Sequence, residues 1–78
     1  MPLSTLNKVP IGTTVTVHSI DSTLVSANRL KDLGFVKNAV VTPLFRSPLS
    51  NTKAFYIKGT IIALRHEDSK KINVITII

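Results

Sequence analysis

No cysteine occurs anywhere in this chain of 78 residues, so neither a disulfide nor a thiolate metal site can compensate for a weak core. A chain of this length buries somewhat more than about 60% of the surface that it exposes when unfolded, which suffices for one core. Hydrophobic residues make up 44% and charged residues 18%, a composition typical of a folding chain. The sequence therefore predicts a single domain over residues 1–78, stabilised by packing alone.

Alternating apolar and polar side chains, the pattern of a half-buried strand, recur along the chain. Phe45 is in phase with Val41, so we expect Phe45 in the core, and the same reasoning places Phe55 in the core and Tyr56 at the surface. Pro43 donates no hydrogen bond and must therefore lie at an edge, a bulge or a sharp bend. The five predicted strands cover residues 13–19, 39–46, 54–58, 60–64 and 73–77.

A helix is predicted between the first two of these strands. Asp21 and Ser22 offer side-chain oxygens for its N-cap, and Gly34 follows its last apolar residue. The apolar residues that define one side of this helix recur every third position, at Leu24, Ala27, Leu30 and Leu33.

Two further local signals complete the predicted order of elements. Gly59 separates two strands and tolerates a positive φ, which predicts a tight hairpin. The polar stretch Arg65–Lys71 suits one or two helical turns before the last strand. Short strands with so few helices predict a mainly β fold, a small antiparallel barrel, and SH3-like and OB-like barrels both fit this pattern.

The chain is basic, with ten Lys and Arg against four Asp and Glu and a formal charge of +6. This balance favours acidic partners. The basic residues are spread along the sequence, however, which is typical of a solvated surface. Nucleic-acid binding would also require aromatic platforms among the basic residues, and the chain has only three Phe and one Tyr.

Motifs for catalysis and metal binding are not found. The glycines are too far apart for a phosphate-binding loop, His18 alternates with threonines on a strand, and neighbours in His66–Asp68 would not face one site on a helix. The sequence predicts no catalytic residue, no metal ligands and no cofactor, and so not an enzyme.

The two ends of the chain bear on localisation and assembly. Residues 1–6 lack the basic and apolar regions of an export signal. The apolar segment Ile72–Ile78 is far shorter than the roughly 20 residues of a membrane span. We therefore expect a cytoplasmic protein, and we expect this segment to form a sheet edge that pairs two chains as a homodimer.

Two segments resemble a known family. Arg29–Phe35 (Arg-Leu-Lys-Asp-Leu-Gly-Phe) and Gly59–Arg65 (Gly-Thr-Ile-Ile-Ala-Leu-Arg) look like the FeoA family of ferrous-iron-transport accessory proteins. The resemblance implies an SH3-like, partly open barrel of five to six short strands, with one helix after the first strand and a short helical turn before the last. Lys37-Asn38 replaces the family's usual Pro-Gly, and Asn38 tolerates the left-handed conformation that such a turn needs.

The resemblance also implies a partner, the membrane GTPase transporter FeoB, with this chain docking on its cytoplasmic part. The expected partner-binding residues are Arg29, Leu30, Leu33, Gly34 and Phe35, with Leu30 and Leu33 supporting a presented Phe35. The alternative is that the leucines belong to the core and Gly34 only caps the helix.

The sequence also leaves two alternative functions open and predicts three structural turns. Alternative functions are nucleic-acid binding through the basic surface, which is not favoured, and a metal-responsive domain like the C-terminal domain of iron-dependent repressors. The turns are expected at Gly34, Asn38 and Gly59.

Overall fold

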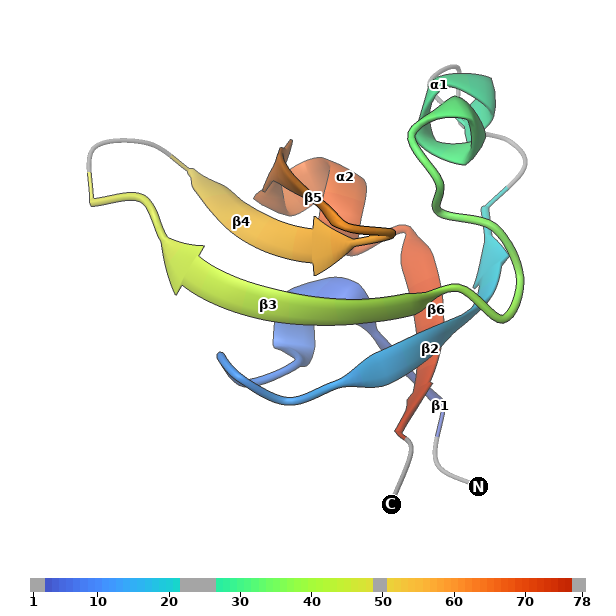
Figure 1. Ribbon diagram of the computed structural model, residues 1–78, viewed down its shortest axis with the longest axis horizontal. Helices are drawn as coiled ribbons and strands as arrows, with labels where there is room; N and C mark the ends of the chain where they lie inside the picture. Colours follow the sequence, from blue (N-terminus) through green and yellow to red (C-terminus); the bar gives the residue numbers. More distant parts are fainter. Residues whose placement is uncertain (1–2, 22–26, 49–50, 77–78) are drawn as a thin grey trace.

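The computed structural model describes residues 3–21, 27–48 and 51–76, and these form one antiparallel sheet with short helices beside it (Figure 1). The strands lie in the order β1-β6-β2-β3-β4-β5, so β1 and β5 are the edges of an open sheet. The strands are β1 (Leu3–Thr5), β2 (Val15–Ile20), β3 (Val40–Arg46), β4 (Thr52–Ile57), β5 (Thr60–Arg65) and β6 (Ile72–Thr76). The helices are the 3-10 helix η1 (Leu6–Lys8), α1 (Ala27–Asp32) and α2 (His66–Ser69).

The core lies on the concave face of the sheet. Val15 and Val17 of β2 are buried there, as their alternation predicts, and so are Phe55 and Ile57 of β4. Leu6 of η1, Leu30 of α1 and Leu64 of β5 join them in one cluster. Because each fully buried side chain of this size contributes about 1.5–3 kcal/mol, this cluster holds together strands that are distant in sequence.

Strand β1 was not predicted, because three residues are too few for an alternating pattern to emerge. Its residues pair with β6, with Leu3 opposite Ile75 and Thr5 opposite Asn73. Strand β6 also pairs with β2 on its other side. The expectation that the C-terminal segment forms a sheet edge for pairing between chains is therefore wrong for Ile72–Thr76, which lie inside the sheet.

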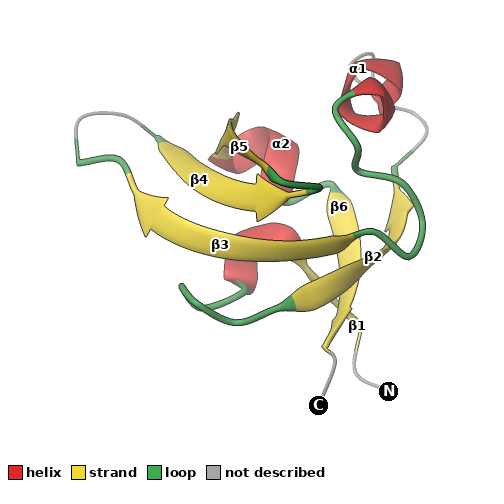
Figure 2. Cartoon of the chain, in the orientation of Figure 1, coloured by secondary structure: helices red, strands yellow, loops and turns green. Residues whose placement is uncertain are grey.

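Strand β3 crosses the sheet as a long curved element (Figure 2) and contains a bulge. Pro43 pairs with Phe55 and Phe45 pairs with Ala54, so Leu44 is an extra residue on β3. The bulge is one of the three placements predicted for Pro43. Pro43 precedes the bulge and is buried in phase with Val41. Because the inserted residue reverses the side-chain alternation beyond it, Phe45 is 57% exposed. The prediction that Phe45 belongs to the core is wrong for this reason.

The hairpin between β4 and β5 has a two-residue turn. Ile57 and Thr60 are the last paired residues, and the turn residues Lys58 and Gly59 have φ values of 50° and 81°. Two consecutive positive φ values are the mark of a type I′ turn, whose twist matches that of the strands. The hairpin predicted at Gly59 is confirmed, and Tyr56 beside it is exposed as expected.

Helix α1 ends in a Schellman motif. Gly34 has a φ of 111°, the Gly34 N–H donates to the Lys31 carbonyl at 3.0 Å, and the Phe35 N–H donates to the Leu30 carbonyl at 3.1 Å. These are the two bonds of the motif, which commonly brings the residue after the glycine against the last turn of the helix. Ser22 and Leu24, two residues of the predicted helix start, lie outside the described residues.

The remaining expected turn and the helical turn are also present. Asn38 has a left-handed φ of 73°, and its N–H donates to the Val17 carbonyl at 2.8 Å. Helix α2 occupies four residues of the predicted Arg65–Lys71 stretch. Within the described part of the chain, no helix is both long and apolar enough to cross a membrane.

Candidate functional site

The convex face of β3, β4 and β5 carries an exposed apolar surface, which we call the outer patch. In the register of the sheet, Tyr56 lies opposite Ile61, and Ala54 lies between Phe45 and Ala63. Tyr56 is 48% exposed and Ile61 is 60% exposed. The outer patch consists of Phe45, Tyr56, Ile61 and Ala63.

The outer patch is continuous because its members are cross-strand neighbours. Phe45 and Tyr56 are diagonal neighbours, since Tyr56 follows the partner of Phe45 by two residues, and aromatic side chains reach across that separation. Ile61 is directly opposite Tyr56 on β5. Large apolar side chains that adjoin on a surface, rather than standing singly, are typical of interaction sites.

Basic residues lie at two ends of the outer patch. Lys58 is in the hairpin turn at one end, and Arg65, which forms an ion pair with Glu67, is exposed at the end of β5. The sequences of β3, β4 and β5 contain no Asp or Glu. An apolar surface with a cationic margin is complementary to an apolar surface with acidic residues around it.

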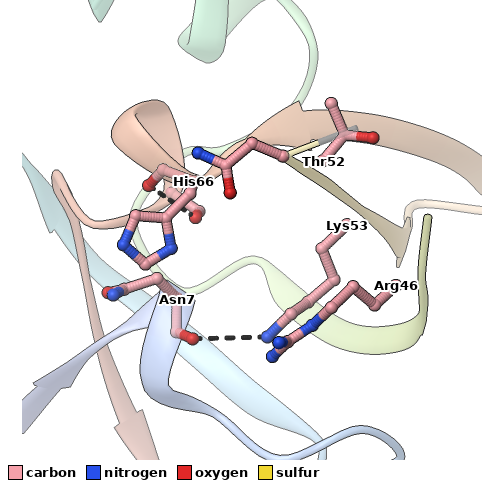
Figure 3. A pocket seen from close by; sticks show the side chains of 7 residues that line it. Asn7, Arg46, Thr52, Lys53 and His66 are labelled. Carbon is pink, nitrogen blue, oxygen red and sulfur yellow. Dashed lines mark hydrogen bonds between the residues drawn. The ribbon is translucent and has the colours of Figure 1, made fainter. Parts of the chain in front are cut away.

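A second feature, which we call the basic cleft, lies where β3 ends and β4 begins, between η1 and α2 (Figure 3). It encloses about 120 Å³. Arg46 and Lys53 are directly opposite each other in the β3–β4 register. The Lys53 Nζ donates to the carbonyls of Asn7 at 3.3 Å and Val9 at 3.5 Å. The lining residues are Asn7, Arg46, Asn51, Thr52, Lys53 and His66, together with Ser69.

The residues that line the basic cleft carry positive charge without acidic residues among them. Burial lowers the pKa of Lys53 below its usual value of 10.5, and the positive charge of Arg46 lowers it further. None of the lining residues is acidic. The ion pairs Arg65–Glu67 at 3.6 Å and Lys71–Asp21 at 4.0 Å involve neither Arg46 nor Lys53.

The predicted partner-binding residues do not form one surface. Arg29 and Leu33 are exposed, with Leu33 at 36%, whereas Leu30, Gly34 and Phe35 are buried. The expected presentation of Phe35 is wrong: Phe35 is 0% exposed, because the Schellman motif turns its side chain into the core beside Leu30. The role of Arg29 and Leu33 in binding stays a prediction.

Neither the outer patch nor the basic cleft was predicted from the sequence. Both depend on the bulge at Leu44, which turns Phe45 outward and directs Arg46 toward Lys53. Pro43 was the available signal, since a bulge was one of its predicted placements, but proline does not show on which side the extra residue falls.

Candidate metal ligands are scattered. His18 and His66 are both exposed, on β2 and at the start of α2. Across residues 3–21, 27–48 and 51–76, no three side chains of His, Cys, Asp or Glu gather in an arrangement that would hold a metal ion.

These features define a class of protein: a small, mainly β domain with one open antiparallel sheet, an SH3-like fold, and an exposed apolar surface. The model of the FeoA domain family matches residues 4–76. The chain therefore belongs to the FeoA family, as the two resembling segments predicted, and the family is linked to ferrous iron transport. No curated protein matches the sequence.

Solved structures agree with this assignment. A FeoA-like protein from Clostridium acetobutylicum is 23% identical, with a TM-score of 0.90 over 100% of this chain and 91% of that one. FeoA from Stenotrophomonas maltophilia, an SH3 domain protein in complex with zinc, is 29% identical, with a TM-score of 0.78 over 91% of this chain and 88% of that one. A manganese-dependent transcriptional repressor shares the fold at 18% identity, with a TM-score of 0.87 over 97% of this chain and 42% of that one.

Proposed function

We propose that this chain is a non-enzymatic accessory protein of ferrous iron uptake, which acts in the cytoplasm by docking on a FeoB-type membrane GTPase transporter. Family membership supports the link to iron transport. The similar FeoA from Stenotrophomonas maltophilia has been suggested to act as a ferrous iron transport activating factor. The outer patch is the observation that carries the docking role, because it is an exposed surface suited to a protein partner.

The composition of the outer patch indicates how it would bind. Aromatic side chains at the centre of an interface contribute much of its binding energy, and Tyr56 has Ile61 opposite and Phe45 diagonal to it. Cations around such a centre increase the rate of encounter with an acidic partner more than they increase affinity. We therefore expect the transporter to present an apolar surface bordered by acidic residues.

Arg29 and Leu33 form a second proposed contact. Both are exposed near the end of α1. The Lys58 side chain lies beside Gly34, where a Cβ would come within 3.2 Å of it. The end of α1 therefore adjoins the β4–β5 turn. A partner bound to the outer patch that extends beyond Lys58 would also contact Leu33.

Direct binding to the isolated cytoplasmic part of the transporter tests the proposal. We expect Tyr56→Ser and Ile61→Ser each to weaken binding about thirtyfold, the effect of losing a hot-spot residue worth about 2 kcal/mol. Leu3→Ser is the matched control, because Leu3 is 57% exposed on β1, at the other edge of the sheet. Leu33→Ser tests the second contact, with an expected loss smaller than that at Tyr56.

Calorimetric titrations should cover low and high salt and the nucleotide-free, GDP-bound and GTP-analogue-bound states of the transporter. Absence of binding in all of these conditions would overturn the docking function. Binding that Leu3→Ser weakens as much as Tyr56→Ser does would show that the outer patch is not the contact.

The exposed aromatics also favour a second candidate function, binding of single-stranded nucleic acid. Bases stack on exposed aromatic side chains, and Phe45 and Tyr56 are neighbours with Lys58 in the adjoining turn. Anisotropy titrations with single-stranded DNA and RNA test this function, since affinity should fall steeply as salt rises. Absence of salt-sensitive binding would exclude it. For the metal-responsive alternative, the likeness to the repressor supports a common fold and no more.

A further inference from the structure

We propose that the basic cleft binds a phosphate group, held between the Arg46 guanidinium and the Lys53 ammonium. This binding site is separate from the outer patch and requires no transporter. Three observations carry the proposal: the pairing of two like charges, the way the Lys53 ammonium is held, and the absence of acidic groups from the walls of the cleft.

The first observation is the position of the two cations. Arg46 and Lys53 are partners in the β3–β4 register, and like charges directly opposite each other on neighbouring strands destabilise a sheet. The bulge at Leu44 imposes this pairing, because without the extra residue Arg46 would alternate to the other face. A doubly charged anion between the two side chains would offset their repulsion.

The second observation is that the Lys53 ammonium is already oriented. It donates to the carbonyls of Asn7 and Val9 on the η1 segment, and an ammonium has three N–H donors. One N–H donor of the ammonium therefore remains for a ligand, and the two hydrogen bonds to the carbonyls fix the position of the ammonium. Figure 3 shows the Arg46 and Lys53 side chains next to each other, both ending near Asn7. The Arg46 guanidinium can add a pair of parallel hydrogen bonds to two oxygens of one phosphate.

The third observation concerns the rest of the cleft. His66 at the start of α2 and Asn51, whose carbonyl accepts the His66 N–H at 2.8 Å, line the cleft and carry side-chain N–H groups. None of the residues that line the cleft has a carboxylate to compete for the cations. Donors on two sides suit a tetrahedral oxyanion, which has acceptors pointing in several directions. The volume of about 120 Å³ accommodates one phosphate group. If that group belongs to a nucleotide, the nucleoside must remain outside the cleft.

Amide NMR titration of the whole chain tests the proposal with three probes: inorganic phosphate, GDP and guanosine, each against sodium chloride at the same ionic strength. We expect saturable shifts of the Lys53 and His66 amides with phosphate. Stronger binding of GDP than of phosphate, with no response to guanosine, would identify a nucleotide as the source of the phosphate group. Shifts that do not saturate, or that chloride reproduces, would overturn the proposal.

Charge-removing substitutions complete the test. Arg46→Gln and Lys53→Met should each weaken phosphate binding about tenfold or more, as expected for a charge-assisted hydrogen bond. Lys37→Gln removes the same charge before the start of β3, roughly 20 Å from Arg46 along a strand of seven residues, and should leave the affinity within about twofold of wild type. Arg46 is exposed, so Arg46→Gln should fold normally. Equal weakening by Arg46→Gln and Lys37→Gln would show only non-specific charge attraction and would overturn the proposal.

Discussion

The end of helix α1 and the convex face of β3–β5 both differ from what their sequences predict, but in opposite directions. Phe35 follows a helix on the segment that resembles a known family, where an exposed contact is expected, and it is completely buried. Phe45 lies in an alternating strand where a core position is expected, and it is exposed. In both regions a single irregularity of the backbone decides the outcome: the left-handed Gly34 in one and the bulge at Leu44 in the other.

The largest difference in stability is expected between truncation of Phe35 and truncation of Phe45. We expect Phe35→Ala to lower the free energy of unfolding by about 3–5 kcal/mol, as for other buried Phe residues. Phe45→Ala should change it by no more than about 0.5 kcal/mol, because surface substitutions rarely do more. Urea denaturation midpoints measure both values. A loss at Phe45 comparable to that at Phe35 would contradict the exposed placement of Phe45.

A smaller effect is expected from the glycine that directs Phe35 into the core. Gly34→Ala forces a Cβ onto a φ of 111° and to within 3.2 Å of the Lys58 side chain, which should cost about 1–3 kcal/mol. Gly12→Ala is the control, because Gly12 also has a positive φ but has no atom within 4 Å of the added Cβ. Thermal unfolding that shows Gly12→Ala to be the more damaging change would contradict the role given to the end of α1.

The smallest effect is expected at Arg46, which the bulge places opposite Lys53. Burial and the charge of Arg46 lower the pKa of Lys53, so the unfolded chain binds more protons than the folded one between the folded pKa and 10.5. Lys53 therefore makes the protein more stable as pH rises through that interval. Arg46→Gln should raise the pKa of Lys53 and weaken this dependence.

NMR titration of the Lys53 side chain in wild type and in Arg46→Gln measures this pKa directly. Lys37→Gln serves as the control, since Lys37 lies beyond the other end of β3. If Arg46→Gln leaves the pKa of Lys53 unchanged, the two charges are not coupled across the strands.

Local sequence determined most of the elements and their inward faces. Val15 and Val17 alternate, Gly59 permits the hairpin, and Asn38 permits its turn, because each of these features depends on backbone preferences within a few residues. The motifs around Gly34 and Gly59 were sufficient to indicate the family. These signals required no knowledge of which strands pair.

Only the tertiary structure decided which surfaces are available for binding. The side of β3 on which Phe45 and Arg46 emerge depends on its register with β4, and the burial of Phe35 depends on the core that receives it. Strand β1 exists only because β6 offers an edge to it. Register and burial are set by contacts between residues far apart in the sequence, so no pattern within one segment determines them.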